Sequence, residues 1–173
     1  MANTYSLISS VTVGSGGSSS IAFTSIPATY TDLVLKFSGR NSRTPSDLQE
    51  FAMTFNNNTS SNYTTVWVRS SGSAVATSTF NNYSSFPELG QPASTVTANT
   101  FSNYEIYIPN YAGSNNKSIS IDGVTENDAT NAFMYLQAGI LANTAAITSI
   151  QISAPSYLIV EYSTFYLYGI SNA

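Results

Sequence analysis

Apolar and polar residues alternate along most of the chain. In the clearest example, over residues 32–39, Leu33, Leu35 and Phe37 alternate with Val34, Lys36 and Ser38. The same period of two recurs in five further runs, at residues 51–55, 105–108, 118–122, 158–162 and 165–168. Successive side chains of a strand point to opposite faces of a sheet, so this pattern predicts half-buried β-strands.

Turn-forming Gly and Asn residues separate these runs, which predicts many short strands joined by tight turns. We expect nine or ten strands, over residues 5–13, 19–25, 33–40, 50–56, 64–69, 104–109, 117–124, 133–139, 148–153 and 157–170, the last broken near Ser163. This number indicates an all-β, jelly-roll-like antiparallel β-sandwich with little helix, formed by a single domain over residues 1–173. Only residues 46–50 and 129–135 are helix candidates.

The segment over residues 72–100 alternates poorly and contains Pro87 and Pro92. It is interpreted either as an extended loop or as a poorly regular pair of strands. Long polar loops vary without disturbing a core, so residues 70–100 are expected to point outward.

The composition narrows the possible functions. The chain has no Cys and no His, which excludes disulfides, thiol nucleophiles, imidazole bases and Cys/His zinc sites. Five cations against nine anions give a net charge of −4, and the cations are scattered, so nucleic-acid binding is not expected. No membrane span and no signal peptide are predicted, so synthesis in a cytoplasm is expected.

Carboxylates are the remaining candidates for catalysis or metal binding. Glu105 and Glu161 alternate with apolar residues and are expected to face outward as solubilising groups. Asp122, Glu126 and Asp128 share one predicted loop, but their spacing departs from an EF-hand, and Asp122-Gly123 reads as a turn. We therefore predict no enzyme activity, no cofactor and no metal.

Two arginines follow a strong predicted strand. Arg40 and Arg43 could contact a carboxylate of a neighbouring subunit or an acidic sugar, or one could pair with Asp47 or Glu50 in its own loop.

Aromatic residues in polar segments form a second set of candidate contacts. They are expected to be exposed where Ser, Thr and Asn surround them, at Tyr63, Trp67, Tyr83, Tyr104, Tyr107 and Tyr111. Such surfaces bind sugars or proteins, although core packing is the alternative for Trp67. Arg40, Arg43, Tyr107, Tyr111 and Trp67 are thus the predicted contact residues.

Several segments resemble a family of small tailed-phage virion structural proteins, common in marine and cyanobacterial phages. The similar segments are Thr4-Tyr-Ser-Leu-Ile-Ser-Ser-Val-Thr-Val-Gly-Ser-Gly-Gly, Ile26-Pro-Ala-Thr-Tyr-Thr-Asp-Leu-Val-Leu, Ile106-Tyr-Ile-Pro-Asn-Tyr-Ala-Gly-Ser, Asp122-Gly-Val-Thr-Glu-Asn-Asp-Ala-Thr, Ala142-Asn-Thr-Ala-Ala-Ile-Thr-Ser-Ile and Ser163-Thr-Phe-Tyr-Leu-Tyr-Gly-Ile. The resemblance implies a virion protein with a jelly-roll-like sandwich, on the capsid surface or associated with tail or fibre. It implies no catalytic residue.

The expected function is a non-enzymatic structural protein that decorates or cements the phage capsid. Its partners would be the major capsid protein or tail components, together with further copies of itself, as a trimer. The alternative is a tail or fibre adhesin that binds a host surface glycan through Tyr, Asn and Arg.

Overall fold

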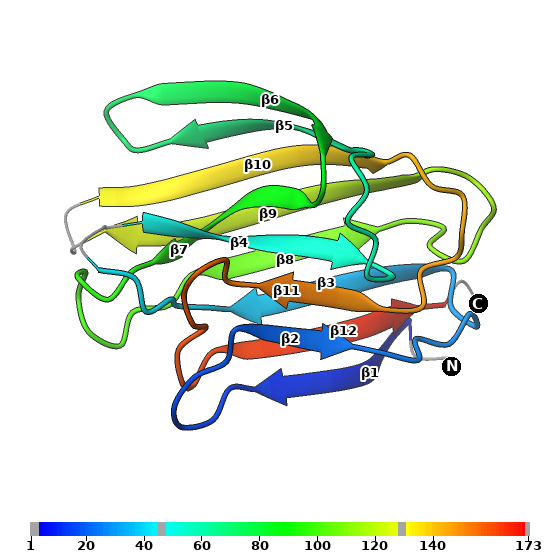
Figure 1. Cartoon of the computed structure of the whole chain (residues 1–173), viewed down its shortest axis with the longest axis horizontal. Coiled ribbons are helices and arrows are strands. Elements are labelled where there is room, and N and C mark those ends of the chain that lie inside the picture. Colours follow the sequence, from blue (N-terminus) through cyan, green and yellow to red (C-terminus); the bar gives the residue numbers. More distant parts are fainter. Residues whose placement is uncertain (1–3, 45–47, 128–130, 172–173) are drawn as a thin grey trace.

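The computed structural model describes residues 4–44, 48–127 and 131–171 as two packed antiparallel sheets. The larger sheet has eight strands, in the spatial order β1-β12-β3-β8-β9-β10-β5-β6. The smaller sheet has four strands, in the order β2-β11-β4-β7. Figure 1 shows the smaller sheet lying over the larger one, with β5 and β6 at one margin of the molecule.

The strands of the larger sheet are β1 (Tyr5–Thr12), β3 (Asp32–Ser38), β5 (Tyr63–Ser70), β6 (Val75–Tyr83), β8 (Asn103–Ile108), β9 (Lys117–Asn127), β10 (Asn131–Leu141) and β12 (Thr164–Ile170). Those of the smaller sheet are β2 (Ser20–Phe23), β4 (Leu48–Phe55), β7 (Phe86–Pro92) and β11 (Ile150–Ser153). The predicted fold class, an all-β jelly-roll-like antiparallel β-sandwich, is confirmed, with twelve strands in place of nine or ten.

The core fills the space between the sheets with the inward members of the alternating runs. Phe51 and Met53 of β4, in the smaller sheet, are fully buried. Leu33 and Leu35 of β3, in the larger sheet, are fully buried in the same core. Phe37 stacks on Tyr104 and on Phe165, with ring centroids 5.0 and 5.2 Å apart. The side chains that hold the sheets together are therefore the alternate residues of each run, as the period of two predicts.

Residues 70–100 differ most from expectation. They contain two strands that are not paired with each other: β6 belongs to the larger sheet and β7 to the smaller sheet. Phe86 and Leu89 of β7 are fully buried. The expectation that this whole segment points outward is therefore wrong. The polar Gln91 is also fully buried, because its amide donates to the Leu89 carbonyl and its side-chain oxygen accepts from Ser102.

Three local predictions are also corrected. The helix candidates fall on strands β4 and β10 where they are described, while residues 46–47 and 129–130 lie outside the described residues. Residues 157–163 form no strand, and Ile159, rather than Leu158, is the buried member of that run.

The predicted turn at Asp122-Gly123 is instead the middle of β9. A Cβ on Gly123 would lie 2.1 Å from the ring of Tyr104. The glycine is thus explained by the close approach of this ring rather than by a turn.

Candidate functional site

The outward face of β10, with two valines of β5 and one valine of β9, carries a row of aliphatic side chains. On β10 the exposed residues include Met134 (53% exposed), Leu136 (56%) and Ile140 (50%). The neighbouring strands continue the row, and we call the whole set the apolar outer face: Val66, Val68, Val124, Met134, Leu136, Ala138 and Ile140.

The strand register makes this face continuous. Leu136 lies opposite Val68 and Ala138 lies opposite Val66, while Met134 lies opposite Val124 on the other side of β10. Directly opposed side chains on one face are near enough to touch. Val66, Val68, Leu136 and Ala138 together line a shallow depression.

Exposure of this kind carries a free-energy cost. A half-exposed Val or Leu forgoes on the order of 1 kcal/mol relative to full burial. Single exposed aliphatic residues are common, whereas a contiguous patch marks a surface that another molecule covers. The apolar outer face therefore has the properties of a protein-contact surface.

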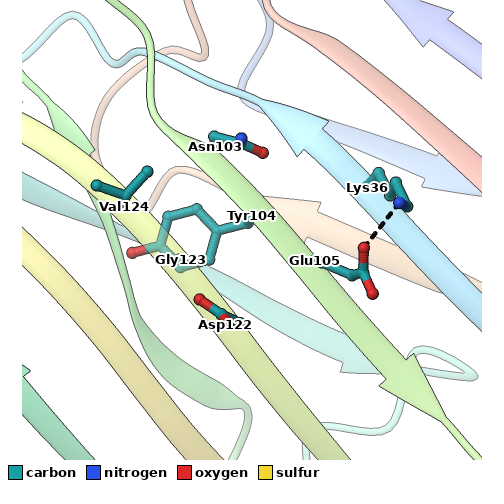
Figure 2. A pocket seen from close by; sticks show the side chains of 7 residues that line it. All are labelled: Lys36, Asn103, Tyr104, Glu105, Asp122, Gly123 and Val124. Carbon is teal, nitrogen blue, oxygen red and sulfur yellow. Dashed lines mark ion pairs between the residues drawn. The ribbon is translucent and has the colours of Figure 1, made fainter.

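A charged margin borders the apolar outer face on β3, β8 and β9. Lys36 and Glu105 form an ion pair with 2.7 Å between Nζ and Oε2, and this contact raises the pKa of Lys36. Asp122 lies directly opposite Glu105, so Lys36 offsets the repulsion between two neighbouring carboxylates. Figure 2 shows these side chains around a depression that Val124 also lines. An apolar centre with a polar rim is the usual composition of a protein interface.

No protein-family model, curated protein or solved structure matches this chain. In the part of the chain that the structure describes, no helix is long and apolar enough to cross a membrane.

The five predicted contact residues do not converge on one surface. Arg40 is only 7% exposed, and its guanidinium donates to the carbonyl oxygens of Val96, Thr97 and Thr100 at 2.8–3.0 Å. Arg40 therefore fixes the loop after β7. It is buried, contrary to the prediction that it contacts another molecule. Arg43 is half-buried and lies 5.1 Å from the ring centre of Tyr157.

Two of the three aromatic contact candidates are buried. Tyr111 is fully buried, and its hydroxyl donates to the carbonyl of Pro27. Trp67 is 8% exposed on the inward face of β5, where Arg69 lies 5.5 Å from its ring centre. Tyr107 is half-buried on β8 and donates to Asp32 at 2.6 Å, a contact that contributes most to raising the pKa of Tyr107 to about 12.

The expected exposure of Tyr63 and Tyr104 is likewise wrong, since both are buried in the core. A tyrosine can be buried when its hydroxyl finds a partner, and the Tyr63 hydroxyl donates to the Asn58 carbonyl at 2.9 Å. Tyr83 is exposed as expected.

Of the carboxylates predicted from the sequence, Glu105 and Asp122 lie opposite each other on β8 and β9, and Glu161 lies apart from them. Glu105 faces outward as expected, whereas Glu161 is half-buried in a turn. Asp122 stands on the outward face of β9, and the side chains of Glu126 and Asp128 lie outside the described residues. Among the residues that are described, no three His, Cys, Asp or Glu side chains are grouped to hold a metal ion.

A different carboxyl pair, not foreseen from the sequence, joins β4 to β7. Glu88 has a left-handed backbone (φ 68°) beside the irregular pairing of these strands, and its carboxyl group hydrogen-bonds to that of Glu50. Burial raises the pKa of Glu88 to about 8, Glu50 adds to the rise, and Arg69 opposes it. Glu50 and Glu88 are too far apart in the sequence for spacing to reveal the pair.

This pair predicts a fall in stability as the pH rises. The folded chain holds a proton on Glu88 that the unfolded chain loses above its ordinary pKa, so the unfolding free energy should decrease between about pH 5 and pH 8. Because the chain has no His, few other groups titrate in this range. Urea denaturation across this range should show the decrease in the wild type and a flatter profile in Glu88→Gln. An equal slope in both proteins would contradict the prediction.

Proposed function

We propose that this protein is a non-enzymatic structural component of a phage virion that decorates or cements the capsid surface. The apolar outer face is the observation that carries this proposal. It would be covered in the assembled particle by a neighbouring subunit, either the major capsid protein or another copy of the chain in a trimer.

The geometry of this face suits a contact repeated over a particle. Its residues stand on three adjacent strands of the larger sheet, with β10 paired to β9 on one side and to β5 on the other, so their relative positions are rigid. The chain carries few charges, so its contacts would depend on apolar burial and neutral hydrogen bonds. We name the virion as the assembly because several segments of the chain resemble tailed-phage structural proteins.

The copy number in purified virions tests the proposal. A decoration or cement protein should be present at a level comparable to that of the major capsid protein, because each repeated capsid position offers a binding site. Gel densitometry of purified particles measures this ratio. A few copies per particle would instead indicate the tail or fibre adhesin, and absence from the particle would overturn a virion role.

A further inference from the structure

A pocket of about 370 Å³ lies at one end of the sandwich, away from the apolar outer face. Three segments enclose it: the loop after β3, the loop between β7 and β8, and the turn that precedes β12. Its walls include Ser42, Ser94, Asn99, Phe101, Glu161 and Tyr162. None of these side chains belongs to the surface assigned above.

Tyr162 is held at this pocket in a strained conformation. Residues 160–163 form a turn in which the Ser163 amide donates to the Val160 carbonyl at 3.1 Å. Tyr162 is the third residue of this turn and has a φ of 70°, a conformation that favours Gly or Asn. Its side chain is 69% exposed, so core packing does not explain an aromatic residue here. Strain of this kind is concentrated at binding sites.

The pocket is built on a fixed base. The carbonyl contacts of Arg40 hold residues 96–100, and the Ser94 hydroxyl donates to the Arg43 carbonyl at 2.6 Å. The Tyr162 amide donates to the Val13 carbonyl at 2.9 Å, which ties the turn to the end of β1. A ligand would therefore meet a preformed cavity, whose ordering cost has already been met in folding.

The chemistry of the walls is that of a site for a polyhydroxylated ring. Tyr162 and Phe101 offer aromatic surface to the apolar face of such a ring. Ser42, Asn99 and Glu161 offer hydroxyl, amide and carboxylate groups to its hydroxyls. The Glu161 carboxylate accepts hydrogen bonds from hydroxyls, and together with Arg40, which also lines the pocket, it leaves no net positive charge to attract an anionic sugar. We propose that this pocket binds a neutral saccharide unit.

Saturation-transfer NMR with methyl glycosides of glucose, galactose, mannose, rhamnose and N-acetylglucosamine tests the proposal on the full chain. At least one neutral glycoside should receive saturation, and the methyl glycoside of N-acetylneuraminic acid should receive none. No transfer to any neutral glycoside, or transfer to the anionic sugar alone, would overturn the proposal.

Tyr162→Gly separates binding from folding. Glycine adopts the positive φ without strain, so this variant should melt at the same temperature as the wild type or higher. Its affinity for the glycoside should nevertheless fall about tenfold or more, since removing a contact aromatic from a binding pocket is costly. Tyr166→Ala removes an exposed tyrosine of β12 that does not line the pocket, and this variant should bind the glycoside as the wild type does. Unchanged affinity in Tyr162→Gly would refute the site, as would a loss in Tyr166→Ala equal to that in Tyr162→Gly.

Discussion

Replacement of Tyr111 by Ala is expected to destabilise the fold by about 3–5 kcal/mol, the range for deleting a large buried aromatic side chain. Tyr111 is fully buried in the main core. Its hydroxyl donates to the Pro27 carbonyl and accepts from the Tyr30 amide, so it joins the β2–β3 connection to the segment after β8. The variant would leave both a cavity and an unpaired carbonyl.

Urea denaturation of the wild type and three variants measures this effect. Tyr111→Phe keeps the ring and should cost only about 2 kcal/mol, because it removes two hydrogen bonds that each contribute about 1 kcal/mol. Arg43 is another of the predicted contact residues. Arg43→Ala removes a half-buried side chain stacked on Tyr157 and should cost less than Tyr111→Ala. If Tyr111→Ala unfolds at the wild-type urea concentration, Tyr111 does not support the core as described.

The alternating runs were sufficient to predict most strands because their inward members are strongly apolar. β4, β8 and β12 follow that pattern directly, and β3 departs from it at Val34, which is fully buried between Leu33 and Leu35. β7 was not recognised as a buried strand because its sequence, FPELGQP, places Gly90, Gln91 and Pro92 at buried positions. A Cβ on Gly90 would lie 2.4 Å from the Tyr135 hydroxyl, and the Gln91 side-chain oxygen accepts a hydrogen bond from Ser102 in the loop after β7. Both reasons depend on the tertiary structure.

The contact surface was harder to predict than the fold. Tyr111 and Arg40 carry polar groups and were interpreted as exposed, yet backbone carbonyls from distant segments satisfy those groups in the interior. The signal for the apolar outer face was present in β10, whose alternate residues from 132 to 140 are all apolar, while Phe133, Tyr135 and Leu141 are apolar on the inward face. A strand apolar on both faces is typically buried on both faces. In this chain the smaller sheet covers only one of them.

Replacement of Leu136 by Asp is expected to abolish self-association. Leu136 lies at the centre of the apolar outer face, opposite Val68, and truncation of a central interface residue commonly costs 2 kcal/mol or more. A buried and unpaired carboxylate adds a desolvation penalty to that loss. The wild-type chain should sediment as a trimer at micromolar concentration, and Leu136→Asp should sediment as a monomer with a dissociation constant raised by about 100-fold or more.

The monomeric fold should survive this change, because Leu136 is more than half exposed and its side chain contributes little to the core. Repulsion between the new carboxylate and Asp122, which lies directly opposite on β9, should lower the free energy of unfolding by about 1 kcal/mol or less. Ala22→Asp is the matched control, since it adds the same charge at an exposed strand position on the smaller sheet. It should leave both the melting temperature and the trimer unchanged, so that a general effect of added negative charge is separated from an effect at the face. A wild-type chain that stays monomeric at high concentration would contradict the predicted self-association. A trimer in Leu136→Asp would show that the copies associate through another surface. Dissociation in Leu136→Asp alone would identify the aliphatic row on β9, β10 and β5 as the surface through which the copies associate.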